Sequence, residues 1–85
     1  MTDHEIRDAI YASLHGVAPE IDLDEIDPAA PSGPQMDVDS IDFLNVLMSI
    51  HERTGVDIPE RDYPKVQTID DTVRYVAARV PAESA

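Results

Sequence analysis

The sequence contains no cysteine, and this absence excludes several kinds of chemistry. The chain can form no disulfide, can offer no thiolate to a metal ion and has no thiol nucleophile. Glycine is also scarce, with only Gly16, Gly33 and Gly55 among 85 residues, so there is no glycine-rich loop that could hold a phosphate. No apolar run of the sequence reaches the length needed to span a membrane.

Positively charged residues are also few. Six Lys and Arg residues stand against 18 Asp and Glu residues, which gives a formal net charge of -12. Nucleic acid is excluded as a partner because contacts to phosphates need a basic surface. Proteins with basic patches are the favoured partners, and their association should be steered by charge and sensitive to salt. The alternative is that the acidic surface only keeps a small protein soluble.

The length of the chain and its first residues limit the possible domain organisation and cellular location. With 85 residues the chain is long enough for one domain and not for two. Met1–Glu5 is acidic where a signal peptide would be basic. We therefore expect a single domain over residues 1–80, a frayed C-terminal tail over residues 81–85, no membrane span and a cytoplasmic location.

Apolar residues recur at helical spacing in three segments, which predicts amphipathic helices over residues 2–15, 40–54 and 69–80. Thr2 and Glu5 have the spacing of a capping box at the first helix, and Gly16 is expected to end that helix. A short helical turn is predicted over residues 59–63, ending before Pro64.

The long segment 17–38 joins the first two helices and carries four prolines, so it cannot form a long helix. Its apolar residues Ile21, Leu23 and Ile26 are expected to hold it against the core, with one helical turn near residues 23–26. The carboxylates around them lack the central glycine and distal glutamate of a calcium loop, and no metal site is predicted. The sum is an all-α fold: a small four-helix bundle, with three longer helices and one short, a long first loop and no strand.

The helix predicted over residues 40–54 is apolar around most of its circumference. A helix of this kind is either largely buried or presents an apolar side to a partner. Leu44, Leu47 and Met48 are predicted to lie in the core, whereas Phe43 and Val46 are harder to place inside so small a core.

Asp39, Ser40 and Asp42 stand where this apolar helix begins. Asp39 and Asp42 have the spacing of a helix-start box, in which the first side chain accepts from a backbone N–H and the second reaches back. If Asp39 caps the helix, Ser40 becomes its first residue, and the Ser40 hydroxyl stays free at the positive end of the helix dipole. The alternative is that Ser40 is itself an ordinary capping residue.

Catalysis by Ser40 is not predicted. His51 stands about 16 Å further along the helix axis, which is too far for a Ser–His pair. His4 and His15 lie at the two ends of the first helix, and no cluster of His, Asp and Glu has metal-ligand spacing. The role that remains for Ser40 is to accept a phosphate group, which the unpaired N–H groups at a helix start favour.

The segment from Met36 to Val80 resembles the acyl carrier proteins. The resemblance is carried by Asp39–Asp42, then by Leu44, Leu47, Met48, Ile50 and Glu52 on the helix, then by Val56–Glu60 and Lys65–Ile69. It implies a four-helix bundle that is not an enzyme. In such a protein Ser40 would carry a 4'-phosphopantetheine arm, transferred from coenzyme A by a phosphopantetheinyl transferase, and the thiol of the arm would hold an acyl group as a thioester.

The resemblance also implies roles for other residues of the second long helix. Asp39, Asp42, Asn45 and Glu52 would form the docking side for acyl-transferring or acyl-modifying enzymes with basic patches, and Phe43, Val46 and Leu47 would line a pocket for the acyl chain. We expect a monomer that serves fatty-acid synthesis or a related lipid or secondary-metabolite pathway. Two alternatives stay open: a carrier of an aminoacyl or polyketide unit, and an unmodified helical module that only binds partners.

The sequence departs from the family pattern at two places. Met36 and Asp37 stand where many fatty-acid carriers have a Leu-Gly pair. Asn45, Ser49 and His51 lie on or near a side that is usually rich in glutamate. These departures favour a specialised carrier with a dedicated pathway. His51 is either a docking charge that changes near neutral pH or an inert surface histidine.

Overall fold

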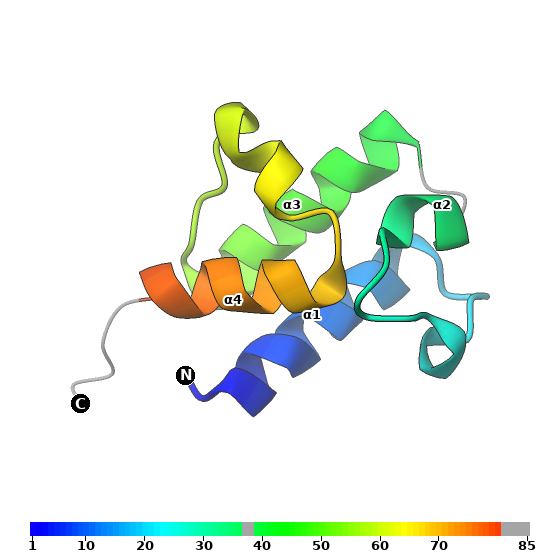
Figure 1. Cartoon of the computed structure of the whole chain (residues 1–85), viewed down its shortest axis with the longest axis horizontal. Coiled ribbons are helices and arrows are strands. Elements are labelled where there is room, and N and C mark those ends of the chain that lie inside the picture. Colours follow the sequence, from blue (N-terminus) through cyan, green and yellow to red (C-terminus); the bar gives the residue numbers. More distant parts are fainter. Residues whose placement is uncertain (37–38, 81–85) are drawn as a thin grey trace.

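The computed structural model describes residues 1–36 and 39–80 (Figure 1). The elements in order are α1 (Asp3–Val17), η1 (Leu23–Glu25), α2 (Ser32–Met36), α3 (Ser40–Thr54), η2 (Glu60–Lys65) and α4 (Ile69–Arg79). Within these two ranges no strand forms, and the predicted all-α bundle of three longer helices is confirmed. The predicted frayed tail over residues 81–85 lies outside the described residues.

The first helix begins as predicted and ends later than predicted. The capping box is complete, because Glu5 N donates to Thr2 Oγ1 at 3.1 Å and Thr2 N donates to Glu5 Oε1 at 2.8 Å. The expected stop at Gly16 is wrong, since α1 continues to Val17. Ala18 ends it with φ -134° and ψ 70°, because a residue that precedes a proline is driven out of the helical region.

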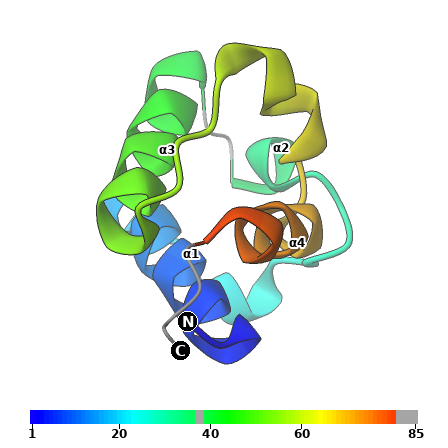
Figure 2. The same ribbon diagram turned by 90° about the vertical axis from the view of Figure 1, so that its left-hand side faces the viewer.

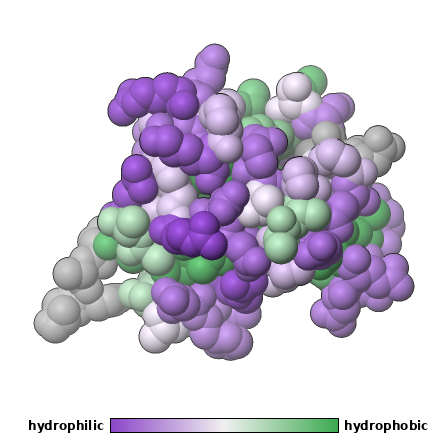
Figure 3. All heavy atoms as spheres, in the orientation of Figure 1, coloured by the Kyte–Doolittle hydropathy of each residue, from purple (hydrophilic) through white to green (hydrophobic). Residues whose placement is uncertain are grey.

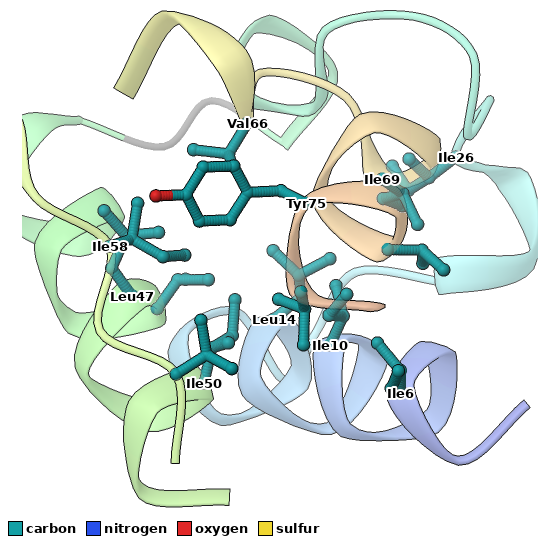
Figure 4. Close-up of a cluster of buried hydrophobic side chains, with 14 of the residues drawn as sticks. Ile6, Ile10, Leu14, Ile26, Leu47, Ile50, Ile58, Val66, Ile69 and Tyr75 are labelled. Atoms are coloured by element: carbon teal, nitrogen blue, oxygen red, sulfur yellow. The ribbon is translucent and has the colours of Figure 1, made fainter. Parts of the chain in front are cut away.

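The core forms where α1 packs against both α3 and α4 (Figure 2). Ile6, Ile10 and Leu14 of α1 meet Ile50 of α3 and Ile69 of α4 in a single buried cluster (Figure 4). Burial of such side chains supplies most of the stability that a short helix cannot supply alone. The face shown in Figure 3 is mostly hydrophilic, with apolar side chains showing between the charged ones.

The long first connection is more ordered than its prolines suggested. Ile26 is buried, and Ile21 and Leu23 are partly buried against the core, so the predicted anchoring is confirmed, as is the helical turn, which is η1. The short helix α2 was not predicted. Pro34 is tolerated there because the first turn of a helix needs no N–H from it.

Gln35 holds this connection in shape. Its Nε2 lies within 3.1–3.3 Å of the carbonyl oxygens of Asp27, Ala30 and Pro31, and its Oε1 accepts from Asp27 N at 2.8 Å. The connection is also bonded to the start of α4, because Ser32 N donates to the Gln67 carbonyl at 3.0 Å. These hydrogen bonds, together with the buried side chain of Met36, hold α2 in place.

The second short helix, η2, extends further than predicted. The turn was expected to end before Pro64, but η2 runs through Pro64 to Lys65. A proline has a φ suited to a 3₁₀ turn and costs only one hydrogen bond there.

A buried polar contact joins η2 to α4. The Tyr75 hydroxyl donates to Asp62 Oδ2, and Lys65 Nζ lies 3.4 Å from the other oxygen of this carboxylate. The Tyr75 hydrogen bond, with help from Lys65, lowers the pKa of Asp62. The Arg79 guanidinium lies 3.6 Å from the centre of the Tyr75 ring and covers the tyrosine.

Tyr75→Phe is expected to destabilise the protein more at neutral pH than in acid. A lowered folded pKa contributes stability above the unfolded value of about 3.9, and this stability is lost as pH falls through the folded value. The substitution removes the main cause of the lowered pKa of Asp62. The urea midpoint should therefore fall clearly at pH 7, and the gap to wild type should shrink below about pH 4.

Tyr63→Phe is the matched control, because among the described residues the Tyr63 hydroxyl has no hydrogen-bond partner to lose. It should leave the midpoint unchanged at both pH values. A gap for Tyr75→Phe that stays constant with pH would contradict the account.

Candidate functional site

The site is organised by the way α3 begins. Asp39 has an extended backbone with φ -88° and ψ -177°, and its Oδ1 accepts from Asp42 N at 2.9 Å. Its carbonyl accepts from Phe43 N at 2.9 Å, and this hydrogen bond closes the first turn of the helix. The predicted cap at Asp39 is therefore confirmed, although within residues 39–80 no return bond runs from the Asp42 carboxylate.

Ser40 is consequently the first helical residue, and it is exposed. Its hydroxyl makes no hydrogen bond in the part of the chain that the structure describes. The first N–H groups of an α-helix have no partner within the helix and carry the positive end of its dipole. The arrangement can place a negatively charged group on this oxygen without breaking any existing contact.

A cavity of about 400 Å³ opens beside Ser40. Asp39 and Ser40 contribute to its wall at the start of α3, and Ile10 of α1 and Ile69 of α4 also line it. All three predicted pocket residues line it, namely Phe43, Val46 and Leu47. The structure thus brings the serine and the predicted pocket residues to one place.

The cavity also has a wall that sequence reasoning missed. Ser32, Gly33, Pro34 and Met36 contribute from α2 and its start, and Val66 and Gln67 contribute from the turn before α4. No periodicity in the proline-rich segment marked these residues, because a helix of five residues is too short to show one. Only the apolar Met36, next to the acidic start of α3, could have signalled them.

The burial along α3 corrects the sequence prediction. Leu47 lies in the core as predicted, but Leu44 and Met48 are 44% and 61% exposed, and Val46 is buried at 5%. The reason is geometric: residues 46, 47 and 50 lie on the buried side of α3, while residues 41, 44 and 48 follow helical spacing along the opposite side, which is exposed. Phe43 lies between the two sides and is half-buried.

The predicted docking residues lie outside this core contact. Asp39, Asn45 and Glu52 are exposed and Asp42 is half-buried. A nearby polar contact joins Arg53 Nε to Ser49 Oγ at 3.2 Å. The outer side of α3 therefore carries acidic, neutral and basic groups together.

No group of three His, Cys, Asp or Glu residues in the described ranges could hold a metal ion. No helix in those ranges is long and apolar enough to cross a membrane.

Comparison with known proteins defines the class. The sequence pattern of the family described as "Phosphopantetheine attachment site" matches residues 8–76. The chain is 34% identical over 76 residues to an acyl carrier protein of Lactobacillus johnsonii, covering 89% of this chain and 94% of the relative. It is 29% identical over 82 residues to an acyl carrier protein of Chlorobium luteolum, covering 93% and 100%.

The fold agrees with these relatives. The solution structure of a candidate acyl carrier protein from Anaplasma phagocytophilum superposes with a TM-score of 0.81 at 26% identity, covering 95% of this chain and 94% of that one. The chain therefore belongs to the acyl carrier protein family. Members of this family are carriers and not enzymes, they hold 4'-phosphopantetheine covalently, and they interact with a phosphopantetheinyl transferase and with acyl-handling enzymes.

The residues present fit this group. A phosphodiester needs an accessible hydroxyl that no other contact occupies, and Ser40 provides one at a helix start. The apolar part of an acyl thioester needs a dry space within reach, and the cavity begins at the same residue.

Urea denaturation of the unmodified protein can show that Asp39 caps α3 and that the Ser40 hydroxyl does not. Asp39→Ala should lower the free energy of unfolding by about 1 kcal/mol, because it removes the cap. Ser40→Ala should change it by less than about 0.5 kcal/mol, as for a surface substitution without contacts. Denaturation in urea checks both, and a Ser40→Ala loss as large as that of Asp39→Ala would show that the serine hydroxyl is itself a cap.

Proposed function

We propose that this protein carries acyl intermediates as thioesters on a 4'-phosphopantetheine arm attached to Ser40. It presents them to partner enzymes of fatty-acid synthesis or of a related lipid or secondary-metabolite pathway. The observation that carries the proposal is the free Ser40 hydroxyl at the edge of the cavity. When bound, the arm supplies the reactive thiol that a cysteine-free chain lacks.

The residues around Ser40 support its role as the acceptor. Asp39 fixes the helix start, so the backbone of Ser40 keeps its place beside the first N–H groups of the helix. The exposure of Ser40 leaves that oxygen accessible to a modifying enzyme. The carboxylates of Asp39 and Asp42 repel a phosphate somewhat, but they attract the basic surface of such an enzyme.

The cavity supports an apolar cargo. Phe43, Val46 and Leu47 form its wall on α3. The polar group of Thr72 in the lining is already occupied, since Thr72 Oγ1 donates to the Thr68 carbonyl at 2.7 Å. A cargo amine placed among the buried apolar side chains of Val46, Leu47 and Ile50 would lose its water without gaining a partner, which is unfavourable. This arrangement favours a fatty acyl group over an aminoacyl unit.

The outer side of α3 supports docking by partner enzymes. Asp39, Asp42 and Glu52 would meet basic residues of a partner, with Asn45 between them as a neutral contact. The small number of acids on this helix supports a dedicated pathway with its own partners. The proposal includes a cytoplasmic monomer in which residues 1–80 form one carrier domain.

Attachment of the arm is tested by intact mass. Wild-type protein incubated with coenzyme A and a broad-specificity phosphopantetheinyl transferase should gain the mass of one arm. Ser40→Ala should gain none, and Ser49→Ala, which removes another serine of α3, should be modified like wild type. Absence of any addition to wild type, under conditions that fully modify a known carrier, would contradict the proposal.

Docking is tested by the salt dependence of modification. The double variant Asp42→Asn with Glu52→Gln should slow the transferase roughly fivefold at low salt, since an exposed ion pair is worth up to about 1 kcal/mol. The effect should nearly vanish at 1 M salt, where the Debye length is about 3 Å. The control is Asp24→Asn with Glu25→Gln on η1, which changes the net charge equally and should have little effect. Equal slowing by both pairs would exclude a specific docking side.

A further inference from the structure

The few basic residues of this acidic chain are gathered in one area. Arg61 and Lys65 of η2 and Arg79 at the end of α4 are half of the six Lys and Arg residues, and all three are exposed. Because η2 packs against α4, they surround one buried contact, which joins the Tyr75 hydroxyl to the Asp62 carboxylate. Arg61, Lys65 and Arg79 are called the basic cluster below.

Contacts with this buried pair place the basic cluster. Lys65 Nζ lies 3.4 Å from Asp62 Oδ1, and the Arg79 guanidinium lies 3.6 Å from the centre of the Tyr75 ring. Arg79 also donates to the Tyr75 carbonyl at 3.3 Å. The pKa of Asp62 is lowered first by its hydrogen bond from tyrosine and then by the nearby positive charges of Lys65 and Arg61. Arg61 is therefore close to the same carboxylate.

The basic cluster carries more positive charge than its neighbours neutralise. Two other arginines, one on α1 and one on α4, each lie within 3.1 Å of a carboxylate of their own. In the basic cluster three cations share Asp62, whose side chain is only 13% exposed and already accepts from a tyrosine. Among the described residues Arg61 has no hydrogen-bond or ion-pair partner. The cluster thus offers unused positive charge to solvent.

The other carboxylates of η2 and α4 lie away from the basic cluster. Residues three apart share one side of a 3₁₀ helix, so Glu60 lies on the side of Tyr63 and not on that of Asp62. The acidic residues of α4 stand in its first turn, about 12 Å or more from Arg79 along the helix axis. The positive charge of the cluster is therefore not cancelled by the elements that carry it.

The basic cluster adjoins the side of α3 that carries Ser40. The rings of Phe43 on α3 and Tyr63 on η2 meet edge to face, with 5.3 Å between their centres. Figure 2 shows η2, in yellow-green, beside α3. Val66, which follows η2, lines the same cavity as Ser40. A protein that approaches the serine along α3 therefore comes close to η2 as well.

We propose that the basic cluster is a second docking surface, which binds an acidic segment of a partner enzyme while the acids of α3 bind its basic residues. The inference rests on the proposed carrier function. Charge complementarity gives the chemistry of the partner. A uniformly anionic surface is disfavoured, because the net charge of -12 on the whole chain repels it. The fitting partner carries a basic and an acidic area side by side, which distinguishes it from an enzyme with a basic area alone.

The test titrates a nitroxide-labelled hexaglutamate peptide into the ¹⁵N-labelled, arm-bearing protein at 0.15 M salt. The Debye length is then about 8 Å, so distant carboxylates of the chain are screened while contacts at the basic cluster persist. The label should broaden the backbone amides of η2 and of the last turn of α4 and leave those of η1 sharp. At 1 M salt, where the Debye length is about 3 Å, the broadening should vanish.

Variants show whether the cluster itself binds the peptide. Arg61→Gln with Lys65→Gln should weaken the apparent affinity about fivefold, since each exposed ion pair contributes modestly. Arg53→Gln with Arg74→Gln is the matched control, because it removes the same charge from exposed arginines outside the cluster, and it should change the affinity less than twofold. Arg61→Gln alone breaks no contact within the described residues and should still weaken binding about twofold, which guards against a folding defect in the double variant.

Equal weakening by both pairs of substitutions would overturn the proposal, and so would broadening without preference for η2. Phosphatidylglycerol vesicles provide the second probe. Binding to the vesicles and not to the peptide would assign the cluster to a lipid surface and contradict an acidic protein segment.

The outcomes separate this inference from the carrier function. The unmodified protein should bind the peptide as the arm-bearing protein does, because Ser40 is not part of the basic cluster. If the arm attaches and the peptide does not bind at the cluster, only this inference fails. If no arm attaches to Ser40, the carrier function fails, and peptide binding by the unmodified protein still decides whether the cluster recognises an acidic segment.

Discussion

The hydrogen bond from Asp42 N to the Asp39 carboxylate, at 2.9 Å, is the contact on which the site depends. A helix start needs a side-chain acceptor for one of its first N–H groups, and serine is among the residues that usually supply it. Because Asp39 fills that need here, the next residue, Ser40, enters the helix with its hydroxyl unused. Serine is common at helix starts because its hydroxyl can cap them, and here that hydroxyl is left available for chemistry.

The same region shows why the cavity persists beside that hydroxyl. α1 packs against α3 and α4, and the short helix α2 lines the space between the start of α3 and the start of α4. Gln35 and the Ser32–Gln67 contact hold α2 there by hydrogen bonds, and Met36 anchors it in the core. A core of this size is thin. The resulting space is bordered by apolar side chains, with Ser40 and Asp39 at the start of α3, so most of its wall suits an apolar guest better than water.

Much of this arrangement could be predicted from the sequence, because it follows from local chemistry. The caps at Thr2 and Asp39 each depend on a few neighbouring residues, and the sequence indicated both of them. The errors have a different origin. Leu44 and Met48 are apolar like core residues, and only the three-dimensional arrangement shows that they are exposed. The helix α2 is too short to show a periodic pattern, and the contact between the Phe43 and Tyr63 rings joins residues far apart in the chain, which no local pattern encodes. The family resemblance supplied the role of Ser40, which the residues alone left open between a cap and an acceptor.

The central claim is that the free hydroxyl of Ser40 leads an acyl group into the interior and not onto the surface. The most direct measurement is methyl NMR of the decanoyl form against the thiol form of the same protein. The account predicts shifts at the methyls that line the cavity, on Val46, Leu47 and Ile69, with Ile6 at the far end of α1 unchanged. Shifts confined to the exposed methyls of Ile41 and Leu44, with the cavity methyls unmoved, would contradict it.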